Sequence, residues 1–262
     1  MDDGALIEAA VTNTVAAYEA VARYATWPVS GGSRRFGKAI AVASGHPTIG
    51  FWNAVVAGVP GTDPDDVLAA HAWIDGLGLP VSVHVGPTEP EGSLDEALEA
   101  RGLRREPWTA PVMALTPIPS AAAHPELRVE MVDAGSYGSW LRAFAGSDEA
   151  TERAGHTFGP GIALDPDLQL ISGYIGDRLV ATSFAVRSGP VVGIYGVHTD
   201  EGFRRRGIGT AITREAIGAG ARWGCVAAIL QASEMGLPVY EAMGFRRIAD
   251  MVSYEAPRRP IG

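Results

Sequence analysis

The amino-acid sequence predicts a mixed α/β fold made of two halves that follow a similar order of elements. Strand-like and helix-like segments alternate along the 262 residues, and 47% of the residues are hydrophobic, which is ample for a large core. Each half ends in a strand, a helix, a strand, a short helix, a glycine and a last strand, which indicates a weak internal duplication. Residues 116–125, TPIPSAAAHP, are rich in proline and alanine and contain no Asp, Glu, Lys or Arg, so we expect them to link the halves.

The first half is predicted to begin with a long helix over residues 5–24. A second helix begins after Thr62 or Asp63, because either side chain can cap the free N–H groups and Pro64 fits the first helical turn. A short helix is expected over residues 94–100. The strands predicted for this half are residues 38–44, 50–59, 79–86 and 107–115.

The second half is predicted to contain helices over residues 137–145, 207–223 and 237–243. The middle helix is the clearest, because apolar side chains recur on one of its faces. Gly176 and Asp177 form the turn of a predicted hairpin. The strands predicted for this half are residues 127–133, the hairpin 168–186, and residues 190–199, 225–233 and 246–256.

Composition excludes several classes of protein. The net charge is −9, and residues 1–120 hold 14 acidic and seven basic side chains. This balance argues against a nucleic-acid partner and favours a cationic one, although it also serves solubility. Cys225 is the single cysteine, so we expect no intramolecular disulfide and a cytoplasmic protein. We also expect no signal peptide, no membrane span and no metal site, because no His, Asp or Glu cluster has metal-ligand spacing.

One stretch carries chemistry, the arginine–glycine turn FRRRGIGT at residues 203–210. It lies between a predicted strand and a predicted helix, and a helix start presents unpaired N–H groups and a partial positive charge. The glycines let a bulky anion approach the main chain, and the arginines and Thr210 add hydrogen bonds. Ile212 replaces the third glycine of a dinucleotide fingerprint, and Ile208 replaces the lysine of a P-loop. The turn therefore predicts a pyrophosphate site of another kind, or else a basic turn closed by glycine.

A second segment, LQASEMGLPVYEAMGF at residues 230–245, follows the next strand. Together the two segments resemble the GCN5-related N-acetyltransferase (GNAT) family over about residues 125–256. The acetyl-CoA motif of the family, Arg/Gln-x-x-Gly-x-Gly/Ala, is matched by Arg204, Gly207 and Gly209. Its later motif, an Asn followed by Tyr and Gly-Phe, is matched by Ser233, Tyr240, Gly244 and Phe245.

The resemblance implies a tandem acyl-CoA N-acyltransferase fold with mixed, mostly antiparallel sheets flanked by helices. Residues 1–118 would be a degenerate GNAT-like domain without the pyrophosphate loop, because PGTDPDD at residues 60–66 puts acids where arginines should be. Residues 119–262 would be the catalytic domain that binds acetyl-CoA. The residues implied for cofactor binding are Val197, Thr199, Arg204, Arg205, Arg206, Gly207, Ile208, Gly209, Thr210, Ser233 and Tyr240.

The resemblance also implies roles in catalysis. Tyr240 would protonate the leaving thiolate, and the strand before the turn would splay from its neighbour and polarise the thioester carbonyl. The family often has Glu or His on this strand as the base, but positions 193, 195 and 197 here hold Gly, Tyr and Val. Glu234 is our first candidate for the base. The alternatives are a water relay through Tyr195, His198 at the opposite parity of the strand, and three side chains of a segment that often covers the acceptor, Asp148, Glu149 and His156.

The resulting prediction is an acetyl-CoA-dependent N-acetyltransferase that acts directly on an amine of a small molecule, a metabolite or an antibiotic. A protein or peptide amine is the second choice. A non-catalytic acyl-CoA-binding regulatory module is the alternative outside the enzyme class, because no obvious base lies on the strand. The sequence leaves the acceptor and the oligomeric state open.

Overall fold

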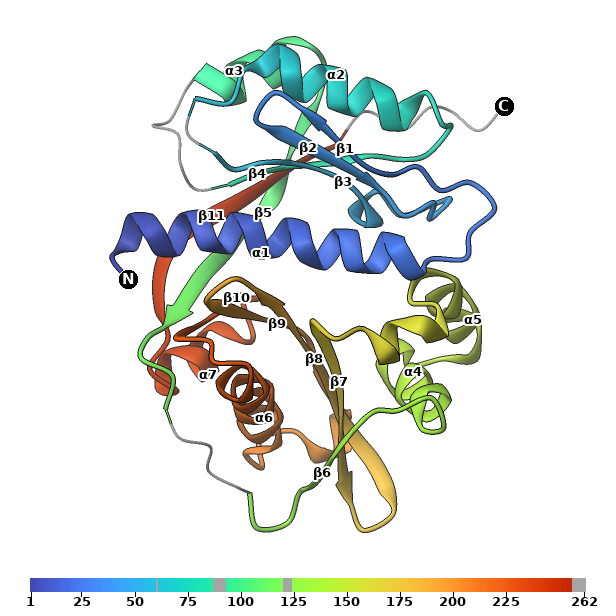
Figure 1. Cartoon of the computed structure of the whole chain (residues 1–262), viewed down its shortest axis with the longest axis vertical. Coiled ribbons are helices and arrows are strands. Elements are labelled where there is room, and N and C mark those ends of the chain that lie inside the picture. Colours follow the sequence, from blue (N-terminus) through green and yellow to red (C-terminus); the bar gives the residue numbers. More distant parts are fainter. Residues whose placement is uncertain (60, 87–92, 120–123, 256–262) are drawn as a thin grey trace.

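The computed structural model of the chain describes residues 1–59, 61–86, 93–119 and 124–255. Its described strands form one sheet in the order β1-β2-β3-β4-β11-β5-β10-β9-β8-β7-β6 (Figure 1). The pairs β3–β4 and β9–β10 are parallel, and the other pairs are antiparallel. The predicted mixed, mostly antiparallel fold is therefore present, with the strands of both halves joined in a single sheet.

The first half contains α1 (Asp3–Tyr24), β1 (Gly32–Phe36), β2 (Ala39–Ala43), β3 (Asn53–Ala57), α2 (Pro64–Asp75), β4 (Ser82–Val85), α3 (Ser93–Ala100) and β5 (Arg104–Leu115). The second half contains β6 (Arg128–Met131), α4 (Tyr137–Ala145), α5 (Asp148–Thr157), β7 (Leu168–Ile175), β8 (Arg178–Ser188), β9 (Val191–Thr199), α6 (Ile208–Arg222), β10 (Ala227–Gln231), α7 (Leu237–Ala242) and β11 (Arg246–Glu255). Short 3-10 turns cover Gly50–Trp52, Pro160–Leu164 and Glu201–Phe203.

Two elements were not predicted. β1 has the sequence GSRRF and pairs only with β2 at the edge of the sheet, so it lacks the apolar alternation of a half-buried strand. α5 is polar along its length, but Ser147 caps it by accepting a hydrogen bond from the N–H of Ala150 (3.2 Å). An ion pair between Glu149 and Arg153 one turn apart adds support. The residues 50–52 begin as a 3-10 turn instead of the expected strand.

The halves exchange their last strands. β11, the end of the second half, lies between β4 and β5, while β5, the end of the first half, lies between β11 and β10. This exchange pairs main-chain groups that would otherwise form the exposed edges of two separate sheets. The predicted division between residues 118 and 119 comes just after β5. It therefore assigns β5 to the first half, although β5 pairs with β10 of the second half.

α1 runs across the middle of the sheet and packs on both halves (Figure 1). Leu6 and Ala10 are buried against β5, β10 and β11, whereas Val15 and Tyr18 are buried against β2 and β3. Val21 packs into the core under α4. The helix is therefore a structural part of the second half as well as the first.

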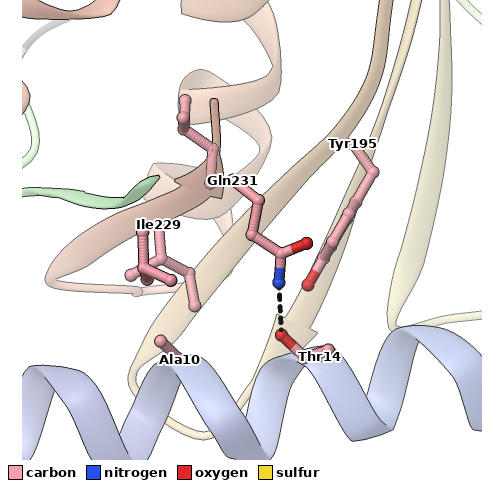
Figure 2. Close-up of a pocket in the computed structure, with 7 residues that line it drawn as sticks. Ala10, Thr14, Tyr195, Ile229 and Gln231 are labelled. Carbon is pink, nitrogen blue, oxygen red and sulfur yellow. Dashed lines mark hydrogen bonds between the residues drawn. The ribbon is translucent and has the colours of Figure 1, made fainter. Parts of the chain in front are cut away.

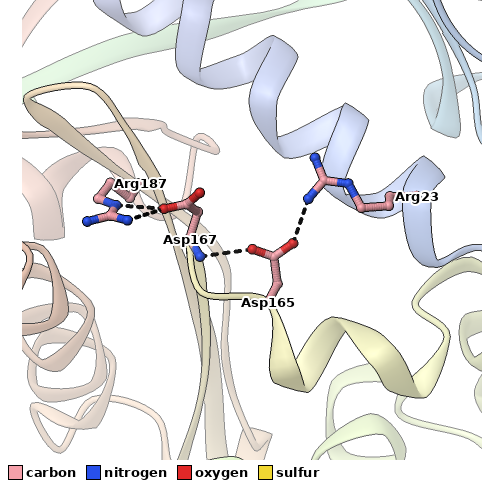
Figure 3. Close-up of polar contacts among 4 residues, drawn as sticks. All are labelled: Arg23, Asp165, Asp167 and Arg187. Carbon is pink, nitrogen blue, oxygen red and sulfur yellow. Dashed lines mark hydrogen bonds and ion pairs between the residues drawn. The ribbon is translucent and has the colours of Figure 1, made fainter.

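A chain of polar contacts fixes the end of α1 to the second half (Figure 3). Arg23, in the last turn of α1, forms an ion pair with Asp165 (2.9 Å), whose side chain is only 2% exposed. Asp165 also accepts a hydrogen bond from the N–H of Asp167 (2.9 Å). The Asp167 carboxylate in turn accepts one from Nε of Arg187 on β8 (2.7 Å). This chain holds α1 at a fixed position over the sheet.

Candidate active site

The parallel strands β9 and β10 form a fork. They pair only at three positions, Val191 with Ala227, Val192 with Ala228 and Gly193 with Ile229. Beyond this point β10 continues to pair with β5 on its other side, up to Gln231. Residues 194–199 of β9 have no ladder partner on the β10 side within the described chain. A free strand edge of this kind can hold an extended ligand by main-chain hydrogen bonds.

A bulge in β9 decides which side chains face each side of the fork. Tyr195 lies opposite Phe184 and His198 lies opposite Thr182, so Gly196 and Val197 together face one residue of β8. Gly196 has a φ of +59°, and a Cβ there would lie 2.8 Å from the rings of Phe144 and Phe184, which explains the glycine.

The bulge corrects the predicted parity of His198. Thr182 and Phe184 are two residues apart on β8, so their side chains point to the same face of the sheet. Their partners His198 and Tyr195 therefore share that face. Val197 packs instead into the core under α6. Regular alternation along the strand, without a bulge, would put His198 on the opposite face.

The arginine–glycine turn stands at the open end of the fork. Gly207 has a φ of +78° and begins α6, whose first intrahelical bond joins the N–H of Ala211 to the carbonyl of Gly207 (2.9 Å). The N–H groups of residues 208–210 therefore have no intrahelical acceptor. Ile208 is buried in the core under α6, so only its main chain is available to a ligand. Arg205 has a φ of +61°, a strained conformation for a residue with a side chain.

The other two arginines of the turn have partners in the protein. Nε of Arg204 donates a hydrogen bond to the carbonyl of Thr199 (3.1 Å). Arg206 forms an ion pair with Glu126 (2.9 Å) and lies over the ring of Phe203. These contacts hold both guanidinium groups near the start of α6.

The structure gives no internal reason for glycine at position 209. A Cβ built there would lie 3.6 Å from Oγ1 of Thr199, which is ordinary van der Waals contact, and its φ is outside the range that favours glycine. Gly207, in contrast, requires glycine for its positive φ. A requirement for glycine at 209 would therefore come from a ligand. Thr210 is half-buried in the first turn of α6.

Tyr240 on α7 approaches α6. Burial raises the pKa of its hydroxyl, and a hydrogen bond with the side chain of Thr213 partly offsets this. Thr213 lies one turn after Gly209 and donates a hydrogen bond to its carbonyl (2.8 Å). The ring of Tyr240 packs edge-on against Phe245. The structure thus brings the two predicted motifs together.

The other predicted residues of this region are exposed. Ser233 accepts a hydrogen bond from the N–H of Gly236 (3.2 Å), so it shapes the turn before α7. Glu234 is exposed in the same turn. Glu149 forms its ion pair with Arg153 on α5, and exposed His156 contacts Thr26 (3.0 Å) and the ring of Trp27. The side chain of Asp148 lies outside the described residues.

A cleft of about 400 Å³ lies between α4 and the ends of β8 and β9. Its lining includes Arg142, Gly146, His198, Asp200, Glu201 and Arg204. Burial lowers the pKa of His198, the charge of Arg204 lowers it further, and Asp200 opposes both. His198 is therefore neutral at pH 7 and can accept a proton.

Two polar residues of α1 near the fork were not predicted as site residues. Asn13 is fully buried and accepts a hydrogen bond from the hydroxyl of Tyr195 (2.7 Å). Thr14 accepts one from Nε2 of Gln231 on β10 (3.0 Å), and Figure 2 shows this pair beside Tyr195. Burial raises the pKa of Tyr195 well above its usual range, so this hydroxyl remains a donor. The sequence feature that could have indicated them is a pair of adjacent polar residues within a mostly apolar stretch of the predicted helix.

Comparisons with known proteins agree with this arrangement. The model of the acetyltransferase (GNAT) family matches residues 136–245. A GCN5-related N-acetyltransferase from Kribbella flavida is 20% identical with a TM-score of 0.68, over 96% of this chain and 97% of its own. One from Sphaerobacter thermophilus is 20% identical with a TM-score of 0.57, over 85% of this chain and 78% of its own. No curated protein sequence matches significantly.

The fold is the one found in solved structures of N-acetyltransferases. The family match identifies residues 136–245 as a domain of the acetyltransferase (GNAT) family, and the predicted resemblance, fold and enzyme class are confirmed. Among the described residues, no group of three or more His, Cys, Asp or Glu side chains has the arrangement of a metal site. In the same part of the chain, no helix has the length and apolar character needed to cross a membrane.

Proposed function

We propose that the protein transfers the acetyl group of acetyl-CoA directly to an amine of a small molecule. The observation that carries the proposal is the start of α6, where free N–H groups, three arginines and an unforced glycine at position 209 meet at the open end of the fork. A pyrophosphate matches this set of donors because it offers several charged acceptor oxygens. The first half is proposed to be non-catalytic and to complete the acceptor side.

The residues present fit acetyl-CoA along the whole fork. Arg204 to Arg206 and the N–H groups of residues 208–210 would hold the pyrophosphate. The main-chain groups of Val197 and the main-chain N–H of Thr199 would hold the extended arm, which then runs toward Gly193 at the base of the fork. A main-chain N–H of β9 near the bulge would donate a hydrogen bond to the thioester oxygen as negative charge develops there.

We propose His198 as the general base in preference to Glu234. His198 lies on β9, shares a face with Tyr195, lines the cleft and is neutral at pH 7. Glu234 is exposed in the turn before α7. His198 lies three residues, roughly 10 Å, along β9 from Tyr195, so in this scheme the amine proton reaches His198 through water. The amine nitrogen attacks the carbonyl carbon, the C–S bond breaks, and Tyr240 donates a proton to the departing sulfur.

The size of the cleft and the net charge of the chain support a small acceptor, cationic as the sequence predicts. A volume of about 400 Å³ suits a small molecule better than a folded protein surface. The lining balances Asp200 and Glu201 against Arg142 and Arg204, so the preference for a cation rests on the net charge of −9. A peptide amine remains the second choice. A cytoplasmic location remains an expectation from the single cysteine.

The test is a panel of small amines and short peptides, with purified protein and acetyl-CoA and with free thiol as the readout. We expect one class of small amine to raise thiol release far above slow hydrolysis. Turnover with peptides alone would favour a peptide acetyltransferase. Tight CoA binding without turnover on any amine would contradict the enzyme and favour a regulatory module.

A further inference from the structure

Two small cavities lie at the base of the fork, where α1 crosses β10. The first has a volume of about 10 Å³ and is lined by Tyr195 of β9 and Ile229 of β10 (Figure 2). The second has a volume of about 20 Å³ and reaches into the first half, to Val56 of β3 and Met251 of β11. Four residues line both cavities, the apolar Ala10 and Val112 and the polar Thr14 and Gln231. Thr14 and Gln231 are therefore the polar part of the wall between the two cavities.

The wall is held by a hydrogen bond. Nε2 of Gln231 donates to Oγ1 of Thr14 over 3.0 Å, and Thr14 is 6% exposed. The first cavity has room for about one water-sized group, since a cavity needs roughly 10–15 Å³ of this volume to hold a water. Beyond the wall, the second cavity is mostly apolar, with Val11, Val56 and Met251 in its lining.

An arm laid along β9 from the arginine–glycine turn ends at these cavities. The free edge of β9 runs from Thr199 to the last paired residue, Gly193, about 20 Å at roughly 3.3 Å per residue. Tyr195 and Gln231 both line the first cavity, one from each arm of the fork. A group carried at the far end of such an arm would therefore point at the Thr14–Gln231 pair.

We propose that the Thr14–Gln231 pair limits the acyl group to two carbons, so that α1 of the first half selects the acyl donor. The inference rests on the proposed function, because it places an acyl-CoA thioester at the base of the fork. An acetyl methyl fits the first cavity. A longer acyl chain must enter the second cavity, which the hydrogen-bonded pair closes. Removing either side chain would take away part of this wall and give a longer acyl chain room toward the second cavity.

The test compares wild type with Thr14→Ala, Gln231→Ala and the milder Thr14→Ser. Thr12→Ala is the matched control, because Thr12 is exposed on the same helix and bonds only within it, to the carbonyl of Glu8 (3.0 Å). Calorimetry gives Kd for free CoA and for acetyl-, propionyl- and butyryl-CoA. Thiol release with one amine gives kcat/KM for each donor, and circular dichroism checks the fold.

We expect wild type and Thr12→Ala to prefer acetyl- over butyryl-CoA by about 10-fold or more, the usual scale for extra methylenes in a closed pocket. Thr14→Ala and Gln231→Ala should lower this preference about 10-fold with unchanged affinity for free CoA. Wild type that uses butyryl-CoA as well as acetyl-CoA would overturn the inference whether or not the variants fold. An unchanged preference in the folded variants would also overturn it. No binding of free CoA to wild type would instead refute the proposed function itself.

Discussion

The hydroxyl of Tyr195 on β9 donates a hydrogen bond to Oδ1 of Asn13 on α1, over 2.7 Å. Nδ2 of the same Asn13 donates to the carbonyl of Val186 on β8 (2.9 Å). One buried side chain of the first half therefore fixes two strands of the second half beside the fork. The acetyltransferase domain is completed by a helix that the linear division of the chain assigns to the other half.

Replacing Asn13 should destabilise the protein. Asn13→Ala leaves the Tyr195 hydroxyl and the Val186 carbonyl without their partner in a buried region, which costs about 1–3 kcal/mol of the free energy of unfolding. Urea unfolding measures this loss, with Thr12→Ala as the control. The double variant Asn13→Ala with Tyr195→Phe should recover part of it, because one unpaired group is removed. Equal urea midpoints for wild type and Asn13→Ala would contradict the role of this contact.

Stability should fall in mild acid because of His84. Its ring is fully buried and contacts Tyr18 (2.9 Å) and Ser253 (2.8 Å), and burial lowers its pKa to about 4. Unfolded histidine has a pKa of about 6.5, so between these values the unfolded chain binds a proton that the folded chain does not. His84 therefore contributes stability that is full above pH 6.5 and lost as pH falls toward 4.

The size of this effect is about 2 kcal/mol between pH 7.5 and 5. Urea unfolding at several pH values measures it, and His84→Gln provides the comparison. We expect the variant to show a shallower dependence of the free energy of unfolding on pH, whatever its stability at pH 7.5. The same slope in both proteins would show that His84 is not the group responsible.

His198 predicts the acid side of the activity profile. Because burial and Arg204 lower the pKa of His198, the acid-side fall in kcat/KM should have its midpoint below about pH 6.5, the value of an ordinary histidine. His198→Gln should lose about 10²-fold or more in kcat/KM. Glu234→Gln should stay within a few-fold of wild type. A large loss in Glu234→Gln with full activity in His198→Gln would return the role of base to Glu234.

Tyr240→Phe should lower kcat by about 10²-fold, the scale of a lost general acid. CoA affinity and the fold should be retained, because one oxygen is removed and the ring still packs on Phe245. Burial raises the pKa of Tyr240 above about 10, the value of a free tyrosine. Loss of its proton should therefore lower kcat with a midpoint above about pH 10. Steady-state kinetics with calorimetry decide this. Turnover close to wild type at unchanged affinity would exclude Tyr240 as the acid.

Local patterns predicted most elements and the arginine–glycine turn, because helix starts, apolar periodicity and glycine positions are written in neighbouring residues. The bulge in β9 was not predictable, because it depends on how Gly196 packs against Phe144 and Phe184. The pairing of β5 with β11 joins residues more than 130 positions apart, so no local pattern predicts it. The position of α1 over the fork depends on the same long-range assembly.

The central claim is that the start of α6 binds the pyrophosphate of acetyl-CoA, and Gly209→Asp tests it most directly. The protein itself should tolerate this change, because a Cβ at 209 meets only ordinary contact and an acid is favourable in the first turn of a helix. Gly209→Ala is the control for size. Calorimetry should show that wild type binds free CoA. Gly209→Asp should bind it about 100-fold or more weakly than wild type, because its carboxylate repels the pyrophosphate. Unchanged CoA affinity in a folded Gly209→Asp protein would contradict the account.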